Sequence, residues 1–201
     1  MALDTMVGLR ARKKERTHQD FMEAGLRMFA ERGFDAVTVE DIAAEVDVSP
    51  RTFYRYFPTK EDLLLDDLSA ALDVLRRSFL SQPSELATMV ALRAALLEVT
   101  KAYEGLARRS LQRARIVEAT PSLKVRQAER QTAWEQVLAP LVAERMGDPP
   151  GEPSLKAQLI ASCSLAALRV AFAAWRVDEG KLRLTDLTAS ALDLLSNRFG
   201  E

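Results

Sequence analysis

The sequence contains few residues that break helices and few that hold metals or disulfides. Its 201 residues include 8 glycines, 8 prolines, one cysteine and one histidine. A single cysteine excludes an internal disulfide and a multi-thiolate metal site, which suits a reducing cytoplasm. The shortage of glycine and proline, with no run of alternating apolar residues, indicates long helices rather than strands. We therefore expect an all-α protein with no metal and no cofactor.

The sequence also lacks an excess of one charge and a long uninterrupted apolar run. Its formal net charge of -1 does not by itself indicate a nucleic-acid binder. No apolar signal core precedes the basic N-terminal residues, so secretion is not expected. The most apolar stretch, residues 159–175, is interrupted by Arg169 and two serines, which favours a buried helix over a membrane span. The prediction is a cytoplasmic protein without membrane contact.

Positive charge is nevertheless concentrated in two segments. Residues 48–60 contain three basic side chains and no acid. Residues 10–16, which we call the basic segment, contain Arg10, Arg12, Lys13, Lys14 and Arg16 against one glutamate. The basic segment can lie along a minor groove or the backbone of DNA, or it can be an ordinary solvated face of the first helix. Both interpretations stay open.

Three N-capping signals follow one another closely between residues 38 and 63. The capping hydroxyls, which can accept an orphan backbone N–H, belong to Thr38, Ser49 and Thr59. Pro50 occupies the first helical position after the second cap, where its missing N–H costs nothing. Phe53 and Phe57 share one helical face, so the hydroxyl and basic side chains of this short helix are left to point elsewhere. Such a crowded pair of helices is typical of a DNA-reading helix-turn-helix.

Apolar periodicity and breakers predict nine helices. Gly33 is placed to end the first helix, and Asp47 would have to take the left-handed turn position after the second. The predicted ranges are about 12–32, 39–47, 50–57, 59–79, 84–102, 103–118, 121–146, 154–179 and 184–198. We expect two domains, residues 1–58 and residues 59–201, joined by the helix that begins at Thr59.

Three motifs of the N-terminal part resemble the DNA-binding domain of the TetR family of transcriptional repressors. They are FAERGF at 29–34, TVEDIA at 38–43 and FYRYFPTKEDL at 53–63. The resemblance implies a three-helix DNA-binding head on an all-helical ligand-binding and dimerisation body, with ligand binding releasing the operator. Asp47 and Arg51 depart from the usual glycine and small residue of the pattern.

The C-terminal part is similar to the ligand domain of the mycofactocin-system regulator subgroup. The motifs that carry this similarity include LQRARIV at 111–117, TPSL at 120–123 and ALRVA at 167–171. The subgroup is associated with acyl-CoA-type effectors, so the similarity implies a small apolar effector, with an acyl-CoA as the first candidate.

The helix-turn-helix assigns roles to its polar residues. Arg51 and Thr52 lie in the first turn of the reading helix, where side chains reach base edges. Tyr54, Tyr56 and Lys60 match family positions that hold phosphates. The predicted DNA-binding residues are Thr38, Ser49, Pro50, Arg51, Thr52, Tyr54, Arg55, Tyr56 and Lys60. The alternative is that the tyrosines are half-buried packing residues and Arg55 a solvated charge.

The body offers apolar and aromatic side chains for an effector cavity between helices. The predicted ligand-binding residues are Met89, Leu92, Leu96, Tyr103, Arg113, Trp134, Leu138, Leu168, Phe172 and Trp175. Alternatively, the apolar residues are ordinary core residues, and the arginines near Arg113 form a solvent-exposed helix face that pairs with glutamates. His18 falls outside the apolar stripe and is expected at the surface, and Cys163 is expected to fill the core or an interface.

The preferred function is a homodimeric repressor that binds a palindromic double-stranded operator and is released by an effector. An apolar stripe along 154–179 gives that helix more apolar surface than one core can use, so the last two helices are expected to form the dimer interface. The alternative is an effector-independent DNA-binding regulator or activator. An enzyme is not expected, because one histidine, one cysteine and no glycine-rich phosphate loop leave no catalytic set.

Overall fold

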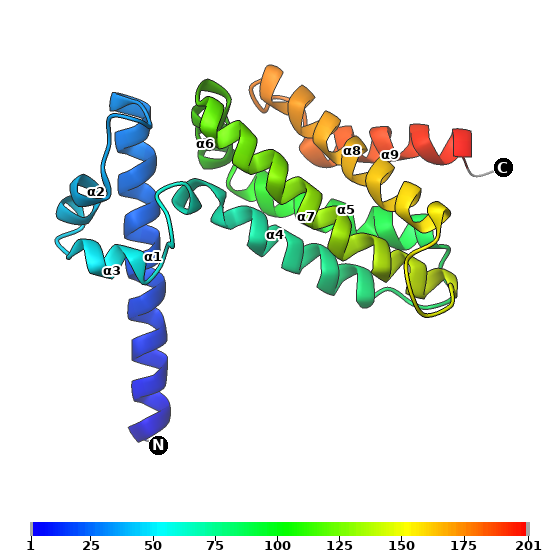
Figure 1. The fold of residues 1–201 in the computed structure, drawn as a ribbon, viewed down its shortest axis with the longest axis horizontal. Coiled ribbons are helices and arrows are strands. Elements are labelled where there is room, and N and C mark those ends of the chain that lie inside the picture. Colours follow the sequence, from blue (N-terminus) through cyan, green and yellow to red (C-terminus); the bar gives the residue numbers. More distant parts are fainter. Residues whose placement is uncertain (1, 200–201) are drawn as a thin grey trace. The chain divides into compact units, whose positions relative to one another are not determined.

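The computed structural model describes the backbone of residues 2–199 and the side chains of residues 12–65 and 69–196. Within residues 2–199 it contains nine α-helices and no strand, which confirms the predicted all-α class (Figure 1). The helices are α1 (Ala2–Arg32), α2 (Val39–Glu45), α3 (Pro50–Tyr54), α4 (Asp62–Leu80), α5 (Thr88–Gly105), α6 (Ala107–Ala119), α7 (Pro121–Met146), α8 (Leu155–Val177) and α9 (Leu184–Phe199).

The internal contacts group these helices into two compact units. The first unit comprises the chain up to Asp67 together with Arg115–Lys124, and the second comprises Leu68–Ala114 and the chain from Val125 onward. Helices α4, α6 and α7 therefore contribute residues to both units. The predicted division between residues 58 and 59 concerns independently folding domains, and it stays a prediction.

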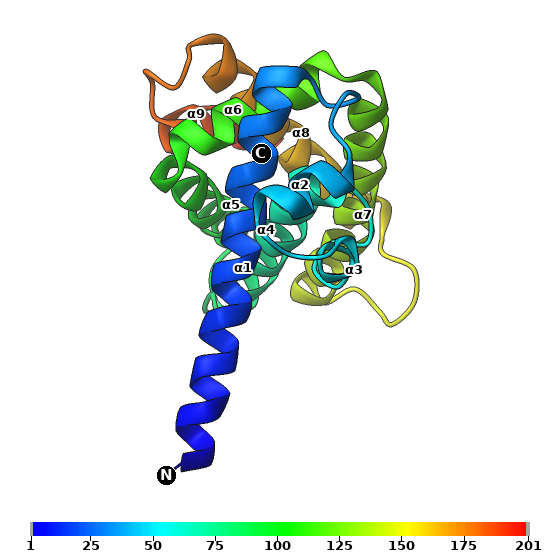
Figure 2. The same cartoon turned by 90° about the vertical axis from the view of Figure 1, so that its left-hand side faces the viewer.

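In the first unit, α2 and α3 lie on one side of α1 (Figures 1 and 2). Gly33 ends α1 with a φ of 84°, as its position in the sequence predicts. After α2, Asp47 takes the predicted left-handed conformation, with a φ of 55°. The amides of Asp47 and Val48 donate to the carbonyls of Ala44 and Ala43, at 3.1 and 2.9 Å. This paired pattern closes the helix end and leads the chain directly into the cap of α3.

Aromatic rings form the core beneath α3. The Phe21 ring meets the Phe53 ring edge-on with centroids 5.3 Å apart, and the Phe57 ring lies 5.3 Å from that of Phe53. His18, which was expected at the surface, is only partly exposed, because its ring packs 4.9 Å from the ring of Phe57. The periodicity of α1 failed to show this because Phe57 comes from another part of the chain.

A glycine inside α1 allows close approach of α4. A Cβ atom built on Gly25 would lie 2.8 Å from the methyl carbons of Leu63, a distance that real Cβ contacts do not reach. Leu63 is fully buried. The glycine therefore lets the first turn of α4 pack against the backbone of α1 within the first unit.

In the second unit, α8 packs against α9, and α9 also packs against α5. The buried face of α8 is made mostly of small residues, which lets the helices approach closely. Among the described residues, α8 is the one helix long and apolar enough to cross a membrane by length and composition. Because its buried face packs on other helices, the same residues fit a core helix, as the sequence predicts.

Several helix boundaries differ from those predicted. Helix α5 begins at Thr88 and not near residue 84, because the guanidinium of Arg145 donates to the carbonyls of Gln82, Pro83 and Leu86 and holds that loop out of a helix. Helix α5 also runs on to Gly105, since Tyr103 continues its buried face. Helix α1 begins at Ala2, about ten residues before the predicted start near Arg12. The remaining helices begin and end within about four residues of the prediction, as is usual for boundary assignments.

Candidate nucleic-acid interface and effector region

The outward face of α3 presents basic and aromatic side chains. Arg51 and Arg55 are exposed, and the side chain of Tyr54 is 52% exposed although its ring touches that of Phe53. The Ser49 hydroxyl caps α3 by accepting from the Thr52 amide at 3.3 Å. The cap fixes the first turn of α3, which contains Arg51 and Thr52, the two residues predicted to read bases.

Tyr56 and Thr52 are held more tightly than the other residues of this face. The Tyr56 ring is half-buried, 5.7 Å from the Phe21 ring, and the Arg55 guanidinium lies 5.4 Å from its centroid. The Thr52 and Ser49 hydroxyls form a hydrogen bond of 3.0 Å. Tyr56 is therefore a half-buried packing residue, as the alternative interpretation expects, and its side chain stays partly exposed.

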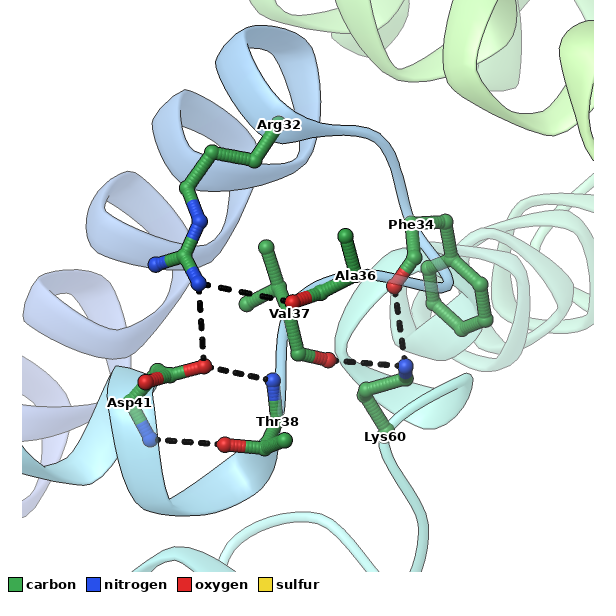
Figure 3. A network of polar contacts seen from close by, with 7 residues as sticks. All are labelled: Arg32, Phe34, Ala36, Val37, Thr38, Asp41 and Lys60. Carbon is green, nitrogen blue, oxygen red and sulfur yellow. Dashed lines mark hydrogen bonds and ion pairs between the residues drawn. The ribbon is translucent and has the colours of Figure 1, made fainter.

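A polar network fixes the start of α2 against the end of α1 (Figure 3). The Thr38 amide donates to the Asp41 carboxylate at 2.9 Å, and the Asp41 amide donates to the Thr38 hydroxyl at 3.1 Å. The Arg32 guanidinium reaches the same carboxylate at 3.4 Å. Hydrogen bonds from the Thr38 backbone and side chain, aided by Arg32, lower the pKa of Asp41 below its ordinary value. The predicted cap at Thr38 is thus confirmed as a reciprocal capping box.

Lys60 reaches into the same region from the turn before α4 (Figure 3). Its ammonium donates to the carbonyl of Phe34 at 2.9 Å and to that of Val37 at 2.8 Å. The nitrogen also lies 4.1 Å from the centroid of the Phe34 ring. The sequence gives no signal for these contacts, because the two carbonyls lie more than twenty positions earlier in the chain.

The basic segment is helical and exposed. Arg12, Lys13, Lys14 and Arg16 are exposed on α1, while the side chain of Arg10 lies outside the described residues. The first turns of α1 extend beyond α2 and α3 (Figures 1 and 2). A helix about 10–12 Å across does not fit a minor groove about 6 Å wide, so the basic segment cannot lie in that groove while it stays helical.

In the second unit, the structure brings most of the predicted effector residues together. The Tyr103 ring meets the Phe172 ring edge-on at 4.8 Å, and the Trp175 ring lies 6.3 Å beyond. The buried Arg113 guanidinium lies 5.4 Å from the Tyr103 centroid. The same core contains Leu92, Leu96, Trp134, Leu138 and Leu168. Met89 is half-buried and stands apart from this core cluster.

Two hydroxyls in this unit are buried without hydrogen-bond partners. Ser164 on α8 and Thr188 on α9 are both fully buried, and their side-chain oxygens have no partner among the described residues. Buried polar groups in proteins are nearly always paired, because leaving one unpaired costs about 1–3 kcal/mol. These hydroxyls were missed in the sequence, where serine and threonine inside apolar helices resemble ordinary small core residues.

An apolar surface remains uncovered on the last two helices. On α8 the side chains of Val170 and Val177 are 60% and 87% exposed, and on α9 that of Leu194 is 69% exposed. Leu155 and Leu159 continue the exposed stripe toward the start of α8, and Cys163 lies half-buried along it. Contiguous exposed apolar side chains of this kind mark interaction surfaces more often than ordinary solvent-facing ones.

Residues 21–66 match the family model described as bacterial regulatory proteins, tetR family, and residues 86–200 match that of the MftR C-terminal domain. The second match alone covers more than half of the chain. The protein belongs to the TetR family of bacterial regulatory proteins.

Curated relatives of this TetR-family protein are transcriptional regulators. The mycofactocin biosynthesis regulator MftR of Mycobacterium tuberculosis is 29% identical over 92% of this chain and 91% of its own length. The regulator TcmR of Streptomyces glaucescens is 30% identical over 94% of this chain and 86% of its own length. The chain is therefore a helix-turn-helix transcriptional regulator and not an enzyme, as the sequence predicts.

Solved structures share the fold. The SmeT–triclosan complex superposes with a TM-score of 0.66 at 17% identity, covering 91% of both chains. The regulator FadR of Bacillus subtilis in complex with stearoyl-CoA superposes with a TM-score of 0.58 at 19% identity, covering 88% of this chain and 96% of that one. At these identities the likeness shows the helical architecture of the TetR-family regulator and nothing about its ligand.

Proposed function

We propose that this regulator is a homodimeric repressor that binds a palindromic operator through α3 and is released by a small apolar effector. The observation that carries the proposal is the exposed face of the capped helix α3, where Arg51, Tyr54 and Arg55 stand over a buried aromatic core. A rigid core under an exposed, basic and aromatic face is what positioning against phosphates and base edges requires.

The DNA contacts divide by role. Arg51 and Thr52 read bases, since a guanidinium binds guanine bidentately and a threonine methyl contacts thymine. Tyr54 and Tyr56 hold phosphates, with Arg55 beside them, while Ser49 and Pro50 set the direction of α3. Thr38 supports this arrangement from the start of α2, where its amide and hydroxyl are already engaged with Asp41.

The second copy would cover the exposed apolar stripe of α8 and α9. Dimers place two reading helices on half-sites one helical turn apart, so a palindrome follows from the symmetry of the protein. The stripe that the sequence predicts is supported by the exposure of its members Leu155, Leu159 and Val170. A dimer that acts on chromosomal DNA would work in the cytoplasm.

The effector would enter the core of the second unit near Tyr103, Phe172 and Trp175. A long-chain acyl-CoA is the first candidate, because the acyl chain suits this apolar core and the similarity to the mycofactocin-system regulator subgroup implies an effector of that type. The buried hydroxyls of Ser164 and Thr188 offer hydrogen bonds to an acyl carbonyl, and Arg113 offers positive charge. Such a ligand can release DNA only through its differential affinity for the two states, about 1–3 kcal/mol in typical cases.

One set of binding measurements tests this function. Selection from a random duplex pool should enrich a palindrome, and sedimentation should show two chains on each selected duplex. Stearoyl-CoA should then weaken binding to that duplex by about 5- to 150-fold. Triclosan serves as a comparison that is apolar but has no acyl chain.

The alternatives give different results. Strong operator binding that no apolar compound weakens would favour the effector-independent regulator. Failure to enrich any palindrome, or one chain on each duplex, would contradict the repressor proposed here.

A further inference from the structure

The basic segment continues the face of α1 that packs on the rest of the first unit. Lys14, His18 and Phe21 follow one another at spacings of four and three residues, so they share one face of the helix. Phe21 is fully buried in the aromatic core, His18 is half-buried and Lys14 is exposed. Followed toward the N-terminus, this face therefore changes from apolar to basic where α1 extends beyond α2 and α3 (Figures 1 and 2).

His18 places this face beside the end of the reading helix α3. Its ring centroid lies 6.4 Å from that of Tyr56 and 4.9 Å from that of Phe57. The Arg55 guanidinium lies 5.4 Å from the centroid of the same Tyr56 ring. Lys14 stands one helical turn, about 5.4 Å along the axis, beyond His18. The exposed positive charge at the end of α3 is therefore followed, across Tyr56 and His18, by that of Lys14.

The cations of the basic segment have no acidic partner among the residues that the structure describes. Further along α1, Arg27 does pair with Glu45 of α2, at 2.6 Å. The one acid within the segment, Glu15, accepts a hydrogen bond from the Gln19 amide at 2.8 Å. Duplex DNA carries one negative charge per about 1.7 Å of its axis, so it complements an exposed helix with unpaired cations. The described cations of the segment, all exposed, are Arg12, Lys13, Lys14 and Arg16.

We propose that Lys14 binds a backbone phosphate of the duplex just outside the half-site that α3 reads. The proposal rests on the DNA-binding function proposed above and adds a contact that lengthens the interface along α1. A lysine ammonium binds a phosphate as a point charge and reads no base. The basic segment then has two faces. The face of Lys14 meets the phosphate backbone, and that of Arg16, about 200° further round the helix, stays in solvent.

The test compares Lys14→Gln with its matched control Arg16→Gln in the full-length protein. Both substitutions remove one positive charge from an exposed position of the same helix. Glutamine is a good helix former, so the melting temperature should stay that of wild type. Affinity is measured as a function of salt concentration on two duplexes. One ends at the outer edges of the two half-sites, and the other continues for one further helical turn, about ten base pairs, on each side.

A phosphate contact and a general electrostatic attraction give different results. On the longer duplex, Lys14→Gln should make the slope of log affinity against log salt concentration shallower by about one unit, because one phosphate fewer is neutralised. Arg16→Gln should keep the slope of wild type. On the shorter duplex all three proteins should have the same slope, since the flanking phosphates are absent.

Three outcomes would overturn the contact. The first is a wild-type slope for Lys14→Gln on the longer duplex. The second is an equal decrease for Lys14→Gln and Arg16→Gln, which an attraction without a specific contact produces. The third is an effect of Lys14→Gln that persists on the shorter duplex, which would place the phosphate inside the half-site.

The contact and the function on which it rests fail in different ways. If wild type enriches no palindrome, the proposed repressor function fails. The slopes of the three proteins on an arbitrary long duplex still show whether Lys14 holds a phosphate, because this contact does not depend on base sequence. If wild type binds its palindrome and Lys14→Gln binds it with the same slope, the contact alone is wrong.

Discussion

At the scale of single residues, the first unit departs from its family pattern at Asp47 and Arg51. Asp47 occupies a left-handed position where glycine is usual, and Arg51 stands where a small residue is usual. The first departure concerns backbone strain, because a residue with a Cβ atom is disfavoured at a φ of 55°. The second concerns side-chain length, because the guanidinium of Arg51 extends further from α3 than the small side chain that is usual at this position.

Replacing Asp47 with glycine should stabilise the protein. The substitution removes left-handed strain at the end of α2 and should raise the free energy of unfolding by about 0.5–1 kcal/mol. Asp47→Ala, the matched variant, keeps the Cβ atom and therefore the strain, and it replaces aspartate by a residue that tolerates the left-handed conformation less well, so it should lower stability. Urea unfolding of both variants measures the difference. Equal stability of the two would show that the turn is not strained.

Replacing Arg51 with alanine should relax sequence preference at one base pair. The loss should be about 1–3 kcal/mol at that position and little elsewhere, because a bidentate contact discriminates one base. Binding to a panel of duplexes with every base at each half-site position measures it. If Arg51→Ala weakened binding to all duplexes alike, the guanidinium would be holding a phosphate.

Residue roles were predictable where they depend on local sequence. The caps at Thr38 and Ser49 and the buried faces of Phe53 and Phe57 follow from spacing within a few positions, and the structure confirms them. The contacts of Lys60 with the α1–α2 loop and of His18 with Phe57 depend on segments distant in the chain. No periodicity within one helix contains that information.

At the scale of elements, the short helix α2 depends on its capping box. Hydrogen bonds from Thr38 lower the pKa of Asp41 below its ordinary value. A carboxylate with a lowered pKa stabilises the fold above its ordinary pKa, and this contribution is lost as the pH falls through the folded-state pKa. The stability that the capping box gives to the start of α2 should therefore decrease at acidic pH and stay unchanged at basic pH.

The substitution Asp41→Asn tests this pH dependence. Wild type should lose more thermal stability than the variant as the pH is lowered below about 4, because the variant has no proton to take up at this site. At neutral pH the variant should be less stable, having lost a charged partner for Arg32. Asp20→Asn on the exposed side of α1 makes the same change in net charge and is the control. Identical acid profiles of wild type and Asp41→Asn would contradict the assignment.

The helices themselves were predictable and some of their ends were not. All nine were expected, since apolar spacing and breakers act locally, but α1 begins at Ala2 and not near Arg12. The start of α5 was misplaced because Arg145, a residue of α7, binds the carbonyls before it. Helix α3 ends at Tyr54 and not at Phe57, because the chain continues as turns toward Pro58.

At the scale of the whole molecule, the grouping of residues 115–124 with the first unit was not foreseen. This segment ends α6 and begins α7, so the chain passes from one unit to the other within α6 and α7 as well as within α4. Its buried residues include Ile116, Val117 and Leu123. The sequence indicated only that one helix ends and the next begins near Pro121.

The proposed dimer is tested with a charge on the exposed stripe. Val170→Glu should give monomers, because an unpaired carboxylate cannot be buried between apolar helices without a large desolvation cost. The side chain is 60% exposed in the single chain, so the monomer should keep its fold and its helix content. Val125→Glu on α7, which is 61% exposed, is the matched control and should stay dimeric. Sedimentation at micromolar concentration measures both.

A dimeric wild type whose Val170→Glu variant also stays dimeric would place the interface elsewhere. Loss of dimers should be accompanied by weak operator binding, because a single reading head retains only half of the contacts.

Because α3 is short, one protein molecule can specify only a few base pairs of the operator. Its 5 residues span roughly 7.5 Å, about two steps of a duplex that rises 3.4 Å per base pair. With side chains reaching to either side, one head specifies roughly four base pairs, and at two bits each a dimer reads roughly 16 bits. Singling out one site among about 10⁶–10⁷ chromosomal positions needs roughly 20 to 23 bits. The missing bits must come from the shape of the intervening DNA, from repeated operators, or from a protein concentration kept low enough that only the best sites are occupied.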